Sequence, residues 1–172
     1  MIMERNAGPA SGVIIVEGQR KIKIEHRILD IIQKYLQTSS NDEESGGLLL
    51  GREEISSGNL IVDHCSTPLE KDERSRFRFV RRDNGHIEYY EELNISKSIY
   101  LYVGEWHTHP EGVPYFSCID ETNWKIISGD KRTPEAQYHL IAGTEAFKIW
   151  RCDSAGRNIS LVCTRTWQAY KE

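Results

Sequence analysis

The feature that most limits the fold of this chain is the shortness of its apolar runs. The two longest are Ile99–Val103, with five residues, and Val13–Val16, with four. A helix that crosses a membrane needs about 20 consecutive apolar residues, so we expect no membrane segment. Runs of four or five apolar residues are typical of short buried strands. The pattern therefore predicts a globular domain built from several short strands.

The length and the charge narrow the fold and the possible partners. A chain of 172 residues suits one domain, because domains commonly contain roughly 100–150 residues. The formal net charge of −4 disfavours nucleic acid as a partner, because phosphate binding needs a basic surface. Met1–Gly12 lacks the apolar stretch of a secretory signal. We expect residues 1–12 to be a flexible tail and residues 13–172 to form the domain.

The four cysteines, Cys65, Cys118, Cys152 and Cys163, are far apart and include no C-x-x-C pair. A chain of this length without a secretion signal does not need a disulfide framework. We therefore expect reduced thiols, a cytoplasmic location and no structural zinc site made of cysteines. Cys152 and Cys163 lie in apolar, strand-like segments, where a thiol packs as a small core residue.

Helical periodicity is clearest between His26 and Gln37, where six apolar residues form one face of an amphipathic helix. Further helices are predicted at Asp83–Lys97 and Ser117–Ser128, and a charged surface insertion at Ser66–Ser75. Strands are predicted at Val13–Val16, Lys21–Ile24, Gly46–Arg52, Asn59–Cys65, Arg76–Val80, Ile99–Glu105, Gln137–Ala142, Ala146–Cys152 and Ile159–Thr164. This order predicts an α/β (α+β) fold with a mixed, largely antiparallel sheet flanked by helices.

The residues that carry chemistry lie where a predicted strand gives way to a predicted helix. His107 and His109 are two residues apart, so on a strand their side chains point the same way. Ser117 and Asp120 are three residues apart, so on a helix they share a face. The loop Pro110–Phe116 can fold the helix start back onto the strand end. Two imidazoles, one carboxylate and an open fourth position are typical of a catalytic zinc site.

Each half of this pattern also has an ordinary structural explanation. Many His-x-His pairs bind no metal, and Ser117-x-x-Asp120 is also a helix-capping pattern in which the serine is the N-cap. One serine can cap a helix and face a site. The full combination of His-x-His-Pro with a serine and an aspartate at these spacings has a chance frequency on the order of one in 10⁴ or lower. Chemistry is therefore the better interpretation of the combined pattern.

The remaining candidate residues are expected to be structural. Trp106 is expected in the core, and Glu105 either supports His107 or lies as a charge at the strand edge. Cys118 follows Ser117 but has no visible base to activate it. The histidines expected to have structural roles are His26, His64, His86 and His139.

The combined pattern resembles the JAMM motif of the MPN+ (JAB-domain) metallopeptidases. The matching residues are His107-Thr-His109-Pro110, followed after six residues by Ser117-x-x-Asp120. That family also places a glutamate before a glycine-rich strand, which Glu43-Glu44-Ser-Gly46-Gly47-Leu-Leu-Leu-Gly51 resembles. Glu44 is in the matching register, and Glu43 is the fallback. The resemblance spans roughly Glu25 to the last strand and implies a single MPN/JAB-type domain.

The resemblance implies a zinc ion bound by His107, His109 and Asp120, which lowers the pKa of its water from about 15.7 toward 7. Glu44 would accept the proton of that water and pass it to the leaving amine. Ser117 would donate a hydrogen bond to the oxyanion, a contribution of roughly 3–4 kcal/mol. Thr108 should face away from the metal and pack in the sheet.

The implied activity is that of a zinc-dependent peptidase or isopeptidase. Its substrate would be a ubiquitin-like or CD-NTase-like conjugate with an extended C-terminal tail, cleaved in deconjugation or in precursor trimming. Tyr115 and Phe116 offer aromatic surface for a small tail residue, although core packing is the favoured alternative for Phe116. The chain looks most like the bacterial JAMM isopeptidases of CBASS-type anti-phage and mobile-element loci.

Two other functions stay open. One is a non-proteolytic JAMM-type domain of the RadC kind. Against it, this chain has Thr108 and Glu111-Gly112 where RadC-like chains have other residues. We also expect this chain to lack room for the helix-hairpin-helix module of RadC-like chains. The other is a catalytically silent MPN interaction module, although such modules lose the ligands that this chain keeps. A metallo-β-lactamase pattern, His-x-His-x-Asp-His, does not match.

Overall fold

The computed structural model describes residues 12–130 and 136–171. The predicted tail, residues 1–12, lies outside this part except for Gly12. Within the described residues, eight strands form one sheet in the order β1-β2-β4-β3-β7-β8-β9-β10. They are β1 (Val13–Glu17), β2 (Arg20–Ile24), β3 (Gly46–Glu53), β4 (Leu60–Cys65), β7 (Tyr100–Thr108), β8 (Gln137–Ala142), β9 (Ala146–Cys152) and β10 (Ile159–Thr166).

The sheet is mixed and largely antiparallel, as predicted. Only β2 with β4 and β7 with β8 are parallel among its neighbouring pairs in the described residues, and the other five pairs are antiparallel. Both parallel pairs place a helix in the connection, as parallel strands require. These helices are α1 (His26–Gln33), between β2 and β3, and α3 (Cys118–Ser128), between β7 and β8.

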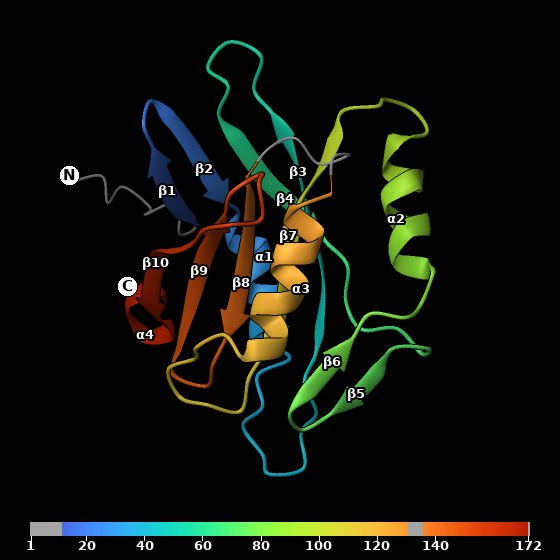
Figure 1. Cartoon of the computed structure of the whole chain (residues 1–172), viewed down its shortest axis with the longest axis vertical. Helices are drawn as coiled ribbons and strands as arrows, with labels where there is room; N and C mark the ends of the chain where they lie inside the picture. The colour runs from blue at the N-terminus through green and yellow to red at the C-terminus, as the bar shows by residue number, and fades with distance from the viewer. Residues whose placement is uncertain (1–11, 131–135, 172) are drawn as a thin grey trace, which may run out of the picture.

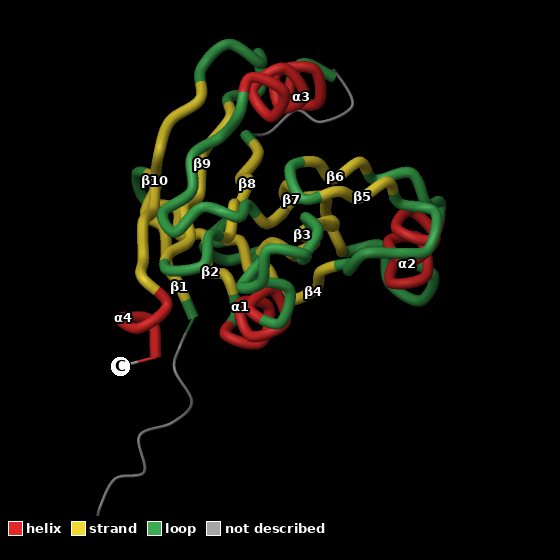
Figure 2. Tube along the Cα trace, turned by 90° about the horizontal axis from the view of Figure 1, so that it is seen from below, coloured by secondary structure: helices red, strands yellow, loops and turns green. Residues whose placement is uncertain are grey.

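Helices cover both faces of the sheet. Seen along the sheet, α1 and α3 lie on opposite faces (Figure 2). The helix α4 (Trp167–Lys171) follows β10 on the α1 side, and α2 (Gly85–Asn94) stands to one side. Next to α2 lies a separate hairpin, formed by β5 (Glu73–Ser75) and β6 (Arg78–Val80) (Figure 1).

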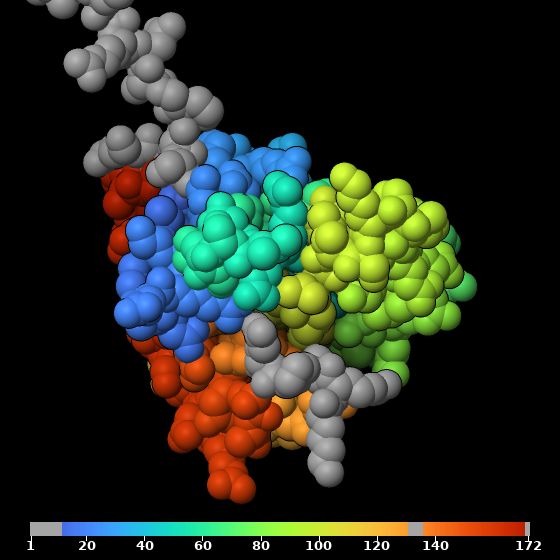
Figure 3. Space-filling view, turned by 90° about the horizontal axis from the view of Figure 1, so that it is seen from above, coloured from blue at the N-terminus to red at the C-terminus, as the bar shows by residue number. Residues whose placement is uncertain are grey.

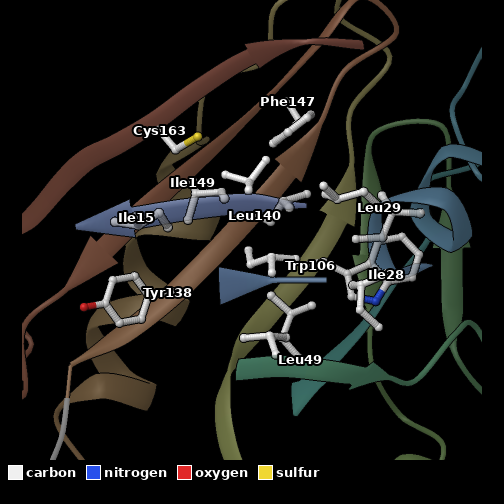
Figure 4. Packing of buried hydrophobic residues seen from close by; sticks show 14 of the residues in the cluster. Ile15, Ile28, Leu29, Leu49, Trp106, Tyr138, Leu140, Phe147, Ile149 and Cys163 are labelled. Carbon is white, nitrogen blue, oxygen red and sulfur yellow. The ribbon is translucent and has the colours of Figure 1, made fainter. Parts of the chain in front are cut away.

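The main core lies between α1 and the sheet. Ile28, Leu29 and Ile32 of α1 are at most 1% exposed and face sheet residues that include Trp106 and Leu140 (Figure 4). Burying one such aliphatic side chain contributes about 1.5–3 kcal/mol. The apolar face predicted for this helix is therefore the face that holds it on the sheet.

The predicted helix His26–Gln37 was too long, because the α-helix ends at Gln33. The amides of Lys34 and Tyr35 donate to the carbonyls of Ile31 and Ile32, three residues back. This tighter pattern is that of a 3₁₀ turn, which is frequent at helix ends. Tyr35 and Leu36 still pack against the core, so the apolar pattern continues beyond the helix.

The segment Ser66–Ser75 is not the simple surface insertion that its charges predicted. Ser66 is buried, and the last three residues form β5. The predicted strand Arg76–Val80 shortens to β6 and pairs with β5 instead of joining the main sheet. Strand pairing depends on which backbone groups meet in space, and the residue pattern of one segment does not contain that information.

The four cysteines form no disulfide, since all of them are free thiols. Burial raises the pKa of Cys65 and of Cys152 to about 12, so these thiols stay protonated. Cys152 and Cys163 lie in the core, as predicted. No helix in the described residues is long and apolar enough to cross a membrane.

The two ends of the sheet are covered by different segments of the chain. One end, drawn in Figure 3, is covered by the β1–β2 turn, the β3–β4 turn and the chain that follows α2. At the other end, the lower one in Figure 1, the start of α3 and the β5–β6 hairpin gather near the carboxyl end of β7. The candidate site lies at this second end.

Candidate active site

The two histidines of the His-x-His pair meet at the end of β7. This strand runs on to Thr108, beyond the predicted end at Glu105, so His107 is part of the strand and His109 follows it. Their Nε2 atoms are 3.0 Å apart. Thr108, between them, is fully buried and accepts a hydrogen bond from the Ser45 amide through Oγ1 at 2.9 Å. The alternation of a strand thus separates two site residues from one packing residue.

Helix α3 brings Asp120 to the histidines. The amide of Ser117 donates to Oδ2 of Asp120 at 2.7 Å, and the amide of Asp120 donates to the Ser117 hydroxyl at 3.1 Å. This reciprocal arrangement is a capping box. From it, Oδ1 of Asp120 lies 3.2 Å from Nε2 of His107, and Oδ2 lies 3.3 Å from Nε2 of His109. The Ser117 hydroxyl accepts one bond and keeps its own proton free to donate.

Glu44 reaches the same site from the segment before β3. Its side chain is buried, and Oε1 lies 3.8 Å from Nε2 of His109, whereas Glu43 is exposed. The β5–β6 hairpin holds the Glu44 backbone, since its amide donates to the Ser75 carbonyl and its carbonyl accepts from the Arg74 guanidinium, both at 2.8 Å. The β5–β6 hairpin, which was not predicted from the sequence, therefore helps to hold Glu44 in the site.

Gly46, two residues after Glu44, occupies a position where a larger residue would not fit. A Cβ on Gly46 would lie 2.6 Å from the Phe79 ring of β6 and 2.7 Å from the Trp106 carbonyl of β7. Real Cβ contacts are not this short, so only glycine allows the hairpin and β7 to approach β3 here. The close approach keeps Glu44 beside the histidines.

The donor set fits a tetrahedral zinc ion. Ligand atoms at about 2.0–2.2 Å from a tetrahedral ion lie roughly 3.3 Å from one another. The His107, His109 and Asp120 atoms are separated by 3.0–3.3 Å. Glu44 is also close, because its carboxylate and the two histidine nitrogens lie within 4.8 Å of one another. The shorter separations fit Asp120 better than Glu44 as the third donor beside the two histidines.

The carboxyl groups of the site have opposite protonation behaviour. Burial raises the pKa of Glu44 to about 7, although His107 and His109 oppose the shift. Burial also disfavours the charged form of Asp120, but the charge of His107 and hydrogen bonds from both histidines hold its pKa well below the usual range. Burial lowers the pKa of His107, and the Asp120 carboxylate more than reverses this and raises it. Glu44 can thus exchange a proton near neutral pH, while Asp120 stays charged.

A cavity of about 470 Å³ opens in front of these residues, between β6 and α3. Its outer walls include the exposed side chains of Phe77, Ile119 and Ile126. Arg81, just after β6, forms an ion pair with Glu105 of β7 at 3.0 Å. Glu105 therefore ties the hairpin to the strand that carries His107. Of these residues only Glu105 was expected to act near His107, because Phe77, Arg81, Ile119 and Ile126 belong to no motif.

The histidines outside the motif are engaged elsewhere. His26 pairs with Asp30 at 2.9 Å, and His64 with Asp63 at 3.0 Å. The buried His86 joins Ser66 at 2.6 Å to Asp72 at 2.8 Å, and so links α2 to the base of the hairpin. His139 is fully buried, accepts the Glu105 amide at 3.1 Å and stacks on Trp124. These contacts are structural, and Trp106 is in the core, as expected.

Residues 27–153 match the family described as prokaryotic homologues of the JAB domain. The chain belongs to this family. The single JAB domain and the mixed α/β fold predicted from the sequence are therefore confirmed.

Several curated relatives of this JAB-domain chain carry the name CD-NTase/cGAS isopeptidase. One from Escherichia coli is 34% identical over 139 residues, which cover 80% of this chain and 85% of the relative. One from Pseudomonas aeruginosa is 31% identical over 130 residues, 75% and 81% of the two chains. One from Vibrio cholerae is 33% identical over 129 residues, 73% and 78%.

Two solved structures share the fold. A protein from Desulfitobacterium hafniense matches with a TM-score of 0.52 at 16% identity, over 81% of this chain and 88% of its own. A protein from Salinibacter ruber matches with a TM-score of 0.50 at 19% identity, over 82% and 88%. At these identities the likeness concerns the fold of the JAB domain alone.

Proposed function

We propose that this JAB-domain chain is a zinc-dependent isopeptidase that releases the C-terminus of a CD-NTase-like protein from its conjugated partner. The observation that carries the proposal is the convergence of three donor groups. The Nε2 atoms of His107 and His109 and the Asp120 carboxylate lie 3.0–3.3 Å apart. The name of the relatives, CD-NTase/cGAS isopeptidase, supports the same substrate class.

The proposed reaction adds water across an amide bond. A zinc ion held by His107, His109 and Asp120 would supply Lewis-acid activation of the water and the carbonyl. Glu44 takes the proton of the attacking water and delivers it to the leaving lysine nitrogen as the C–N bond breaks. The products are a free carboxylate and a free amine. Ser117 donates its hydroxyl proton to the oxygen that becomes negative in the transition state.

The cavity supports a substrate that lies in an extended conformation. Strand β6, rather than β5, lines the cavity, and β6 pairs with β5 as a two-stranded sheet. A protein tail beside such a strand can add backbone hydrogen bonds, while its side chains enter shallow pockets. Phe77 and Ile119 offer apolar contacts along the way. Contacts remote from the cleaved bond then contribute to transition-state stabilisation.

The first experiment tests the metal and the activity together. Protein purified without added metal should contain one zinc per chain, and His109→Ala should lose it. A conjugate that joins a CD-NTase C-terminus to a lysine side chain should be cleaved, with loss of cleavage after chelation and recovery on adding zinc. Zinc binding without any cleavage would contradict the proposal and favour a silent MPN module or a RadC-like domain.

The second experiment tests the extended tail. The same conjugate is compared with short dipeptide amides that carry the same cleaved bond. We expect a much higher kcat/KM for the conjugate, and Phe77→Ser should lower kcat/KM only for the conjugate. Equal kcat/KM for the two substrates would show that the tail contributes nothing.

A further inference from the structure

His109 has one ring nitrogen without a partner. Its Nε2 atom faces His107 and Asp120. Its Nδ1 atom is buried and has no hydrogen-bond partner within the part of the chain that the structure describes. A buried polar nitrogen without a partner is costly. A histidine that binds a metal through one nitrogen usually donates the other N–H to a carboxylate or a carbonyl. The geometry of His109 thus leaves one such partner to be identified.

Glu111 is the nearest acidic group to this nitrogen. Its Oε1 atom lies 3.5 Å from Nδ1 of His109. Its other oxygen, Oε2, accepts a hydrogen bond from the Tyr115 amide at 3.2 Å. The carboxylate is therefore held by one oxygen while the second points toward His109. A distance of 3.5 Å is slightly too long for a strong hydrogen bond, and such a bond requires the half-exposed Glu111 side chain to rotate toward the ring.

The backbone under Glu111 is held by the turn between β8 and β9. The Glu111 carbonyl accepts from the Thr144 amide at 2.9 Å, and the Gly112 carbonyl accepts from the Glu145 amide at 2.9 Å. Gly143 allows this contact, because a Cβ there would lie 2.6 Å from the Glu111 carbonyl oxygen. The loop after the motif is thus fixed to the sheet, and it presents the Glu111 side chain to His109 from a defined position.

We propose that Glu111 is a positioning residue for the metal site. Its carboxylate accepts the Nδ1–H of His109 and so holds the ring with the Nε2 lone pair directed at the ion. Glu111 touches neither the metal nor the reacting bond and acts through His109. The inference rests on the proposed zinc site, and it assigns a role to a residue that the motif leaves free.

The test measures zinc affinity by competition with a chromophoric chelator in wild type, Glu111→Ala and Glu111→Gln. We expect Glu111→Ala to bind zinc about 10–100-fold more weakly, the usual cost of losing such an outer partner. Glu111→Gln keeps an acceptor oxygen and should recover most of that loss. The matched control is Glu145→Ala, which removes an exposed carboxylate that lies against Gly112 of the same loop. Its zinc affinity should equal that of wild type.

A second readout separates positioning from folding. Glu111→Ala also removes the acceptor of the Tyr115 amide, so the Tm of the metal-free protein should fall slightly, and zinc affinity is measured well below that Tm, where wild type and variant are both folded. Zinc affinity of Glu111→Ala within twofold of wild type would overturn the inference, as would an equal loss in Glu145→Ala. If wild type itself binds no zinc, the proposed function fails instead, so the two failures are distinguishable.

Discussion

Ser117 and Asp120 exchange hydrogen bonds across the first turn of α3: the Ser117 amide donates to the Asp120 carboxylate at 2.7 Å, and the Asp120 amide donates to the Ser117 hydroxyl at 3.1 Å. The same carboxylate lies 3.2 and 3.3 Å from His107 and His109. The group that starts the helix is therefore also the group that faces the histidines. The same hydrogen-bonded turn therefore caps the helix and holds the Asp120 carboxylate in the site.

Ser117→Ala should affect both stability and catalysis. Loss of an N-cap hydroxyl costs about 1 kcal/mol of folding free energy. Loss of an oxyanion donor lowers kcat by about 10²–10³-fold. Urea unfolding and steady-state kinetics on the conjugate measure the two effects.

Two control variants separate these roles of Ser117. Glycine is a tolerated N-cap, so Ser117→Gly should fold with a loss of only a few tenths of a kcal/mol and yet show the full loss of kcat. Ser117→Thr keeps the hydroxyl and should retain both properties. A kcat for Ser117→Gly within a few fold of wild type would remove Ser117 from the reaction and leave it a cap alone.

Glu44→Gln should keep its zinc and lose hydrolysis. A general base contributes about 10²–10⁴-fold to the rate, and glutamine preserves the shape of the buried side chain without accepting the proton. Metal analysis and kinetics on the same preparation test this. The exposed neighbour provides the control, because Glu43→Gln should leave both zinc and kcat unchanged. Loss of zinc in Glu44→Gln would instead make Glu44 a ligand.

The Arg81–Glu105 ion pair should set how well the hairpin is held beside the cavity. The two side chains are 28% and 23% exposed and 3.0 Å apart, and pairs of this kind contribute about 0.2–1 kcal/mol. Arg81→Ala should therefore raise KM for the conjugate by about 1.4- to 5-fold with little change in kcat.

The swapped pair, Arg81→Glu with Glu105→Arg, should restore KM in part. The Arg82–Glu73 pair, 3.1 Å apart on the same hairpin with both side chains 57% exposed, is the matched control, and Arg82→Ala should leave KM unchanged. If Arg82→Ala and Arg81→Ala raise KM equally, the increase comes from the loss of a positive charge on the hairpin and not from the loss of the Arg81–Glu105 ion pair.

His139 should make stability depend on pH. Burial lowers its pKa to about 3, from an ordinary value of 6.5. Between these values the unfolded chain binds a proton that the folded chain does not, so the unfolding free energy falls as pH falls. The slope is about 1.4 kcal/mol per pH unit in this window, and the contribution is constant above pH 6.5.

The variant His139→Asn tests this. Its amide oxygen can still accept the Glu105 amide, which Nδ1 of His139 accepts at 3.1 Å, but it has no proton to gain. In metal-free protein, urea unfolding between pH 4.5 and 6.5 should give a shallower pH slope for His139→Asn than for wild type. Parallel slopes would show that another group is responsible.

The features that could be predicted correctly from the sequence are those that depend on near neighbours along the chain. Strand alternation puts His107 and His109 on one side with Thr108 on the other, because side chains alternate along any strand. The Ser117-x-x-Asp120 capping box forms wherever a helix begins at this serine. The buried face of α1 follows from the 3.6-residue period of its apolar side chains. For this reason the His-x-His and Ser-x-x-Asp halves of the site could be predicted as such.

The way in which separate segments meet could not be predicted from the sequence and is visible only in the folded chain. Glu44 could be chosen over Glu43 only by motif resemblance, and its place beside His109 depends on the Ser75 and Arg74 contacts from a hairpin that the sequence did not predict. The approach of Glu111 to His109 likewise depends on the β8–β9 turn, which lies more than thirty residues further along the chain. Such contacts join segments whose patterns are independent of each other, so no local periodicity contains them.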